Sequence, residues 1–347
     1  MKWFLGLLFG LVIFYRDSFF SLFFQDDFLL LKLSKQGNFI APIPNFPYRP
    51  IAIQAFYSLG SLISGNQPFG FHLLSFVLFS GALLFVYLLS SQILKNPSAA
   101  RLGTLFYAFN ISLFPIFFWV ATSYFVLAAF FTFGALYFFM RSGSWSFTMS
   151  LIFFLLGLLS NELVLVTPVL LVLINYLQKT RLWIRLVPYV VVGVVYALFR
   201  LQLSFPSASD YHLNFGLKNF LTTLRWYFWR IFNLPEGVRT GASPMIYLLF
   251  IACLGIFIII LSKTTRKWLI FSTLWFIFGA LPFFFLPNHM SSYYLTLSLF
   301  GPAVLIGKSL ADDKRLTIIF FIFYLLLAVF GLNYLSQTHW IILKPTR

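Results

Sequence analysis

The chain has 347 residues, of which 61% are hydrophobic and only 9% are charged, and it carries a formal net charge of +16. A soluble domain typically contains about 25% charged residues, so this composition excludes a soluble globular protein. Apolar runs recur from end to end and are continuous rather than alternating. This pattern predicts an all-α, polytopic integral membrane protein and excludes an outer-membrane barrel.

The excess of Lys and Arg is spread through the segments between the apolar runs. Anionic lipid head groups, and a phosphate-bearing substrate, account for such a distribution more simply than nucleic acid, and we expect no nucleic-acid partner. Cys253 is the only cysteine, so no intrachain disulfide can form.

The N-terminal apolar run ends at Tyr15 and is followed by Arg16 and Asp17 instead of a small-residue cleavage site. We therefore expect an uncleaved first helix rather than a signal peptide. Residues from about 25 to 70 then break the apolar pattern and form a first large outer loop. Within this loop, short amphipathic pieces at Phe28–Leu33 and Ile51–Leu62 predict helices that lie in the membrane interface.

Ten further apolar runs follow, which makes about eleven predicted spans with the first helix. They lie near 71–94, 102–120, 122–140, 145–160, 163–178, 186–203, 244–262, 268–286, 293–310 and 316–335. A second large polar region occupies about 204–243. Within it, Phe215–Phe232 combines Trp with Lys and Arg, which indicates an interfacial helix that does not cross the membrane.

The distribution of Lys and Arg between short loops predicts the orientation. One set of loops is basic, and the loops near 121–123, 160–162 and 287–292 contain no Lys or Arg. The basic residues are Lys95, Arg101, Arg141, Lys179, Arg181, Arg185, Lys263, Arg266, Lys267, Lys308, Lys314 and Arg315. We expect this set to be cytoplasmic, so both large loops face the extracytoplasmic side of a bacterial inner membrane or an equivalent membrane.

Asp26 and Asp27 stand together in the first outer loop of a chain that has only eight acidic residues. Neighbouring helical residues point about 100° apart, so the two carboxylates cannot do identical work. One of them suits a general base, with its neighbour orienting it or a substrate. The alternative is an acidic pair placed at a helix N-terminus because the helix dipole favours it there.

Three more outer residues are candidates for binding a substrate. Glu162 lies alone in a very short loop between two apolar runs, where an ordinary solvated turn residue is the alternative. His72 begins the second span and His289 lies in a late outer loop, and for a lone His a packing or capping role is the alternative. Outer His and carboxylate groups leave a divalent metal ion open, but no ligand spacing indicates one.

Positive charge in the two outer loops suits a phosphate or pyrophosphate group. Arg49 supplies it in the first loop, and Lys218, Arg225, Arg230 and Arg239 supply it in the second. Attraction to anionic lipids explains part of this set equally well. The sequence contains no P-loop, dinucleotide-binding Gly motif, nucleophile elbow or HExxH motif, which argues against soluble nucleotide-sugar and ATP chemistries.

Taken together, these stretches resemble the polytopic glycosyltransferases of the C superfamily. The likeness is greatest to the protein mannosyltransferases that use dolichyl-phosphate mannose and to the tetratricopeptide-linked membrane mannosyltransferases, and more distant to the bacterial aminoarabinose transferase. Four stretches carry it, in the family's order: Asp26-Asp27-Phe28; Tyr48-Arg49-Pro50 with Asn66-Gln67-Pro68-Phe69-Gly70-Phe71-His72; Leu159-Ser160-Asn161-Glu162; and His289-Met290-Ser291-Ser292-Tyr293-Tyr294-Leu295.

The chain departs from the family pattern at several positions. Asn161 stands where the family has a Lys, which places one phosphate contact in doubt. Phe79 and Ser75 stand where the family has a His and an Asn, and no tetratricopeptide repeat is present. The resemblance therefore implies a single transmembrane glycosyltransferase module over residues 1–347, without naming the sugar.

By this resemblance, a polyprenyl-phosphate sugar is the donor, and a glycan, lipid or protein hydroxyl is the acceptor. Asp26 deprotonates the acceptor, which attacks the anomeric carbon with inversion and expels polyprenyl phosphate. The resemblance gives Asp27 and Glu162 a role in orienting the substrates and assigns Arg49 to the phosphate. We expect Tyr293, with His72, His289, Arg225 and Arg230, to contact substrate. The donor is already activated, so the mechanism requires no metal cofactor.

Two other classes of protein remain open at this point. A transporter or flippase of lipid-linked glycans would place ionisable residues near the middle of its helices and often shows inverted repeats. A non-catalytic relative would retain the fold without the chemistry. A polysaccharide polymerase or ligase is chemically closer to the transferase. The Asp pair followed by the Arg49-Pro50 segment favours the transferase.

Overall fold

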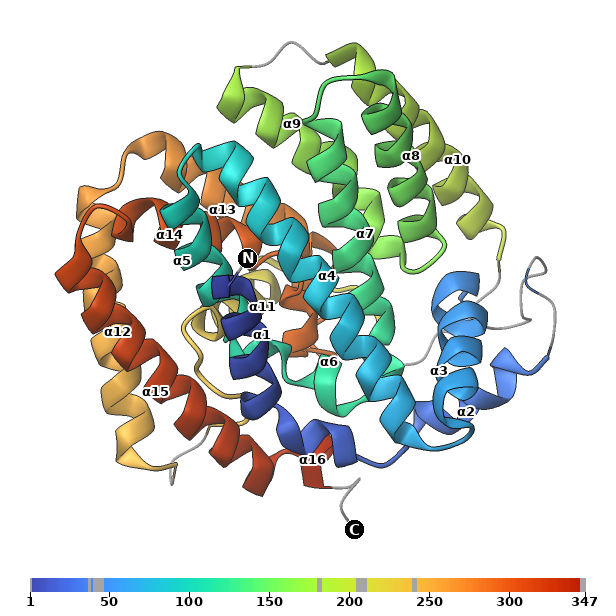
Figure 1. Cartoon of the computed structure of the whole chain (residues 1–347), viewed down its shortest axis with the longest axis horizontal. Helices are drawn as coiled ribbons and strands as arrows, with labels where there is room; N and C mark the ends of the chain where they lie inside the picture. The colour runs from blue at the N-terminus through green and yellow to red at the C-terminus, as the bar shows by residue number, and fades with distance from the viewer. Residues whose placement is uncertain are drawn as a thin grey trace.

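In the computed structural model, residues 2–36, 39, 47–179, 183–203, 211–238 and 242–343 are described. Over these residues the chain is built from helices and contains no β-strand (Figure 1). The longer helices are α1 (Lys2–Phe14), α4 (Pro68–Leu94), α5 (Pro97–Ala108), α7 (Ser123–Phe139), α8 (Ser144–Leu158), α9 (Thr167–Gln178), α10 (Val187–Leu201), α11 (Leu217–Arg230), α12 (Pro244–Lys263), α13 (Arg266–Ala280), α14 (Phe300–Leu310) and α15 (Lys314–Thr338).

Shorter helices join these or cap the bundle. They are α2 (Asp26–Ser34), α3 (Phe56–Ser64), α6 (Pro115–Phe118) and α16 (Trp340–Leu343). A π-helical turn, η2 (Ile51–Ala55), leads directly into α3, and 3₁₀ turns η4 (Val120–Thr122) and η5 (Glu162–Val166) lead into α7 and α9. The predicted interfacial helices thus appear as α2, η2 with α3, and α11.

Six helical stretches are long and apolar enough to cross a membrane, and a bent pair would make a seventh. The six are Pro68–Leu94, Val120–Phe139, Trp183–Leu201, Pro244–Lys263, Arg266–Phe285 and Lys314–Thr338, and the bent pair joins Pro97–Ala108 to Ile111–Phe118. Helices occur at all eleven predicted places, but the count of eleven spans is not confirmed. The four others, Lys2–Phe14, Ser144–Leu158, Glu162–Gln178 and Phe300–Leu310, are apolar but shorter than 18 residues.

Local sequence determines where many of these helices start. Pro occupies the first turn of α4, α5, α9, α10 and α12, where its missing N–H costs no hydrogen bond. The Asn96 side chain caps α5 by accepting the main-chain N–H groups of Ser98 and Ala99. The end of α4 is marked by Lys95, which adopts the left-handed conformation with φ of 51°.

The centre of the bundle depends on glycine contacts between α5 and α14. A Cβ atom added to Gly307 would lie 2.2 Å from the carbonyl oxygen of Ala99, and one added to Gly103 would lie 2.6 Å from that of Ala303. Small residues let two helix backbones approach this closely, which is common where helices pack within membranes. Around this pair, α4 packs on α5 and α7, α7 on α8, and α12 on α15.

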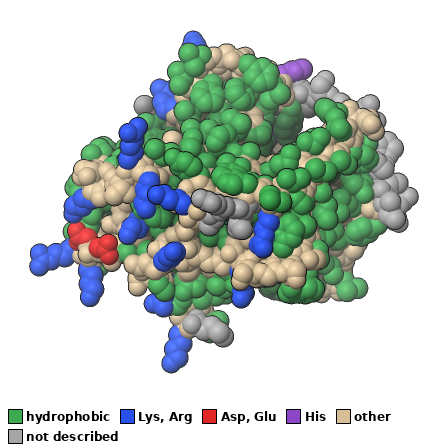
Figure 2. All heavy atoms as spheres, turned by 90° about the horizontal axis from the view of Figure 1, so that it is seen from above, with side chains coloured by type: hydrophobic (Ala, Val, Ile, Leu, Met, Phe, Trp, Pro, Cys, Tyr) green, Lys and Arg blue, Asp and Glu red, His purple; other side chains and the backbone are tan. Residues whose placement is uncertain are grey.

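One end of the bundle carries basic connections between helices. The connections from α4 to α5, α12 to α13 and α14 to α15 carry Lys and Arg and lie in the upper part of Figure 1. Figure 2, which views the molecule from above, shows Lys and Arg side chains spread over this face. In the lower part of Figure 1, α2 and α3 lie beside the start of α4, and α16 follows α15. Arg181 and Arg239, which belong to the predicted basic sets, lie outside the described residues.

Candidate active site

Asp27 is an anchor between two segments that lie far apart in the sequence. Its side chain is fully buried. One carboxylate oxygen accepts the N–H of Phe24 at 3.1 Å, and the other accepts the N–H of Ala121, in η4, at 2.6 Å. Burial raises the pKa of Asp27 to about 7. The hydrogen bonds from the two main-chain N–H groups oppose this increase, and the negative charge of Asp26 adds to it. The carboxylate therefore fixes the start of α2 against η4.

Asp26 precedes the anchor and is exposed. The chain turns into α2 at Gln25, whose φ of 48° is in the left-handed region that non-glycine residues seldom adopt. Partial desolvation raises the pKa of Asp26, and the charge of His289 opposes the increase. Asp26 accepts no hydrogen bond from a described residue, so its carboxylate is available to a ligand.

His289 faces Asp26 from the loop that precedes η9 (Ser292–Leu295). Its ring lies 4.3 Å from the ring of Tyr211, measured between centroids, and its Nε2 lies 3.5 Å from the hydroxyl of Tyr293. Tyr293 is buried, and the centroid of its ring lies 4.8 Å from that of Phe125. Of the predicted substrate-binding residues, His289 thus interacts with the exposed carboxylate, and Tyr293 contacts His289.

Arg49 and Glu162 form a bidentate ion pair across 113 residues of sequence. Arg49 Nε donates to Oε2 of Glu162 at 2.9 Å, and Nη2 donates to Oε1 at 2.5 Å. Arg200, at the end of α10, places its Nη2 3.5 Å from the same Oε1. A main-chain hydrogen bond from Ile51 to Leu159 brings the two chain segments together.

These three residues form a cationic cluster with a net charge of +1. The side chains of Arg49 and Arg200 are 15% and 14% exposed, and that of Glu162 is 38% exposed. Burial opposes the charge on Glu162, but Arg49 and then Arg200 outweigh it and lower the pKa to about 2. Glu162 is therefore ionised at neutral pH, between the guanidinium groups of Arg49 and Arg200.

Tyr124 connects the cationic cluster to Asp26. The Arg49 guanidinium lies over its ring, 4.5 Å from the centroid. The Tyr124 hydroxyl interacts electrostatically with Arg49, Glu162, Tyr211 and Asp26. The exposed carboxylate and the cationic cluster thus meet at Tyr124 and are treated as one candidate site.

The remaining predicted residues lie elsewhere. His72 is buried in the first turn of α4, with Nδ1 2.7 Å from the carbonyl oxygen of Phe117 and Nε2 3.1 Å from that of Ser21. These contacts tie α4 to two neighbouring segments and give His72 a structural role. Arg225 is exposed on α11. Arg230 is buried and stacks on Trp226, 4.2 Å from its ring centroid.

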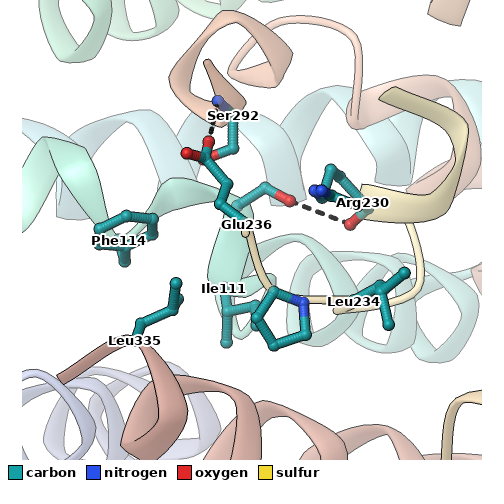
Figure 3. Close-up of a pocket in the computed structure, with 9 residues that line it drawn as sticks. Ile111, Phe114, Arg230, Leu234, Glu236, Ser292 and Leu335 are labelled. Atoms are coloured by element: carbon teal, nitrogen blue, oxygen red, sulfur yellow. Dashed lines mark hydrogen bonds between the residues drawn. The ribbon is translucent and has the colours of Figure 1, made fainter. Parts of the chain in front are cut away.

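Arg230 belongs to a second polar group, which lines a pocket together with Glu236 and Ser292 (Figure 3). Glu236 extends from its loop so that Oε1 accepts the N–H of Ser292, as Figure 3 shows. Its Oε2 lies 3.0 Å from Nε2 of His339. Burial opposes ionisation of Glu236, but His339 and Ser292 outweigh it and lower its pKa, with a further contribution from Arg230.

Sequence reasoning missed Arg200, Tyr124, Glu236 and His339. The scarcity of charge that singled out Glu162 applies equally to Glu236, one of eight acidic residues, and to His339, one of four His. Arg200 and Tyr124 give no such signal, because each ends or begins an ordinary apolar helix.

The fit of a resident metal ion can be tested on the side chains present. Within the described ranges, no group of three or more His, Cys, Asp and Glu residues is arranged to hold a metal ion. Both oxygens of Asp27 are engaged by main-chain N–H groups, which leaves Asp26 as the accessible carboxylate beside His289.

Comparison of the chain with known protein families, with curated proteins and with solved structures found no match.

Proposed function

We propose that the protein is a membrane-embedded, inverting glycosyltransferase that moves a sugar from a polyprenyl-phosphate donor to an acceptor hydroxyl. One observation carries the proposal: Tyr124 interacts both with an exposed carboxylate, Asp26, and with the Arg49–Glu162 ion pair, which Arg200 joins. A sugar attached to a phosphate needs both groups, a base for the incoming hydroxyl and a cation for the departing phosphate.

In the proposed reaction, the acceptor hydroxyl gives its proton to a carboxylate oxygen of Asp26. The acceptor oxygen forms a bond to the anomeric carbon from the face opposite the phosphate, and the bond between that carbon and the phosphate oxygen breaks. The electron pair leaves with polyprenyl phosphate, whose charge Arg49 and Arg200 compensate. Asp26 then releases its proton to solvent. Asp27 positions Asp26 instead of touching the substrate.

The cationic cluster also suits a donor that arrives from the lipid phase. Arg200 ends α10, whose side chains Val190, Val191, Val194, Val195 and Leu198 are each at least 50% exposed. A polyprenyl chain lying along this apolar face would bring its phosphate to the level of Arg200. We propose that this end of the bundle is extracytoplasmic, because the opposite end carries the basic connections typical of the cytoplasmic side.

The transporter alternative has less support. None of the six candidate spans contains Asp or Glu, whereas transporters place such groups within their spans. The acidic groups of the described residues lie at helix ends and in the connections between helices, which suits a reaction at the membrane interface.

The test is turnover of a panel of polyprenyl-phosphate sugars by the purified protein in lipid nanodiscs. We expect Asp26→Asn to lower turnover by about 10²–10⁴-fold, the usual contribution of a general base, while the donor still binds. Asp17→Asn is the matched control, since Asp17 is an exposed carboxylate that precedes the site by nine positions and pairs with Arg16. The proposal fails if the wild type consumes no donor, or if Asp26→Asn turns over at the rate of the control.

A further inference from the structure

The segment that follows α15 is locked in place by His339. Its Nε2 lies 3.0 Å from Glu236, and its Nδ1 accepts the main-chain N–H of Ile341 at 3.3 Å. Because Nδ1 accepts a hydrogen bond, the neutral ring carries its proton on Nε2 and donates it to the carboxylate. The other carboxylate oxygen is held by Ser292. The turn from α15 into α16 is therefore fixed to η9.

This turn places Trp340 against the two chain segments that hold Asp27. The Trp340 ring lies 5.3 Å from the ring of Trp119 and 5.9 Å from that of Phe24, both in edge-to-face geometry. The rings of Phe24 and Trp119 are 5.5 Å apart. Phe24 donates its own N–H to Asp27, and Trp119 lies two residues before the other donor, Ala121.

We propose that Trp340, held by the Glu236–His339 pair, is a positioning residue that sets the Asp27 anchor and, through it, the place of Asp26. The contacts form a continuous path: the Glu236–His339 hydrogen bond fixes the turn, the indole packs on the two aromatic rings, and their main-chain segments bind the buried carboxylate. Trp340 is 39% exposed, so its ring is not needed to fill the centre of the bundle. The catalytic part of this inference rests on the proposed function.

The experiment measures amide hydrogen exchange and steady-state kinetics on the full chain in nanodiscs. The variants are Trp340→Leu and Glu236→Gln, the latter weakening the latch without touching the indole. Trp340→Phe keeps an aromatic ring and Trp145→Ala removes an exposed indole from α8, so both serve as controls. Peptides of α14, at the glycine contact, report on the integrity of the whole fold.

For Trp340→Leu we expect the amides of Phe24 and Ala121 to exchange faster by about tenfold, with α14 unchanged. We expect kcat to fall by about tenfold or more because a displaced catalytic group loses its alignment, while the KM for the donor changes by less than about twofold. Glu236→Gln should change both quantities in the same direction, and both controls should behave as the wild type.

The possible results separate the two proposals. Unchanged exchange at both amides would overturn the positioning role whatever the enzyme does. Faster exchange with unchanged kcat would show that Trp340 supports the anchor without controlling Asp26, and would also overturn it. If the wild type has no turnover, the proposed function fails, and the exchange data alone decide whether Trp340 holds the anchor. Faster exchange in Trp340→Leu that includes α14 would mean general unfolding of that variant. The exchange of Phe24 and Ala121 in Glu236→Gln then decides, and unchanged exchange there would overturn the positioning role.

Discussion

Replacement of Asp27 by Asn should abolish a pH dependence of stability that Asp27 imposes on the wild type. The pKa of this carboxyl is raised from 3.8 to about 7, chiefly by burial. A raised folded-state pKa means that the stabilisation is complete below the unfolded pKa and is lost as the pH rises through the folded one. At about 1.4 kcal/mol per pKa unit, the wild type should lose about 3–4 kcal/mol between pH 4 and pH 8.

Asn cannot titrate, and it can accept only one of the two main-chain hydrogen bonds. At pH 4–5 the variant should therefore be less stable than the wild type by about 1–3 kcal/mol, the cost of a buried unpaired N–H. Near pH 7 the relief from burying a charge offsets this loss, so the two proteins should converge. Asp26→Asn, one residue away and exposed, should keep most of the wild-type slope while losing turnover.

The assay is thermal unfolding at a fixed scan rate, followed by tryptophan fluorescence in one detergent from pH 4 to pH 8. Glu162 opposes this slope only near pH 4, since its pKa is 4.5 unfolded and about 2 folded, and the contribution of Asp26, whose pKa is also raised, is isolated by Asp26→Asn. A slope in Asp27→Asn equal to that of the wild type would refute the assignment of the titration to Asp27. Loss of the slope in Asp26→Asn would refute the division of roles between the two residues.

Three further variants test the rest of the structure. In the wild type we expect stability to be lost as the pH falls from about 4.5 to about 2, because the folded-state pKa of Glu162 is depressed. Glu162→Gln should remove this loss, and acid unfolding monitored by circular dichroism measures the difference. Gly307→Ala should lower the free energy of unfolding by several kcal/mol or prevent folding, since its Cβ would meet the carbonyl oxygen of Ala99. Gly255→Ala, whose Cβ would have nothing within 4 Å, should be neutral, and equal melting temperatures of the two variants would contradict this. His72→Leu should destabilise by about 1–3 kcal/mol, since the buried carbonyl that accepts the ring N–H loses its donor. The donor KM should not change, and a raised KM would place His72 in the site.

Much of the helical framework follows from local sequence. Apolar runs gave the places of the helices, and Pro68, Pro97 and Pro244 lie in the first turns of α4, α5 and α12. The number of spans could not be predicted from local sequence. A helix of 11–17 apolar residues has the same composition as a spanning helix and differs from it only in where it begins and ends. The end of α5 is an example: the chain bends by 51° before α6, where the sequence predicted one straight span.

Site residues could be predicted from the sequence where their residue type is rare in this chain. They could not be predicted where only a contact between distant chain segments brings them into the site. Asp26 and Asp27 are conspicuous because acidic residues are few, and their separation on a helix predicted that they could not act alike. Which of the two would be buried depends on Ala121, 94 residues away, whose N–H carries no signature in the sequence. The same holds for Arg200, which becomes part of the site only because α10 ends beside Glu162.

The acidic residues of the described chain give a final argument for Asp26. Asp17 pairs with Arg16, Asp27 binds main-chain N–H groups, and Glu162, Glu236 and Asp313 pair with Arg49, His339 and Lys263. Asp312 is exposed at the basic end of the bundle. Asp26 is the described acid that lies at the other end, is accessible, and accepts no hydrogen bond from a described residue. Because nearly every other described carboxylate is paired or bound to main-chain N–H groups, this accessible one, in the same site as Arg49 and Arg200, is the group we expect a substrate to meet.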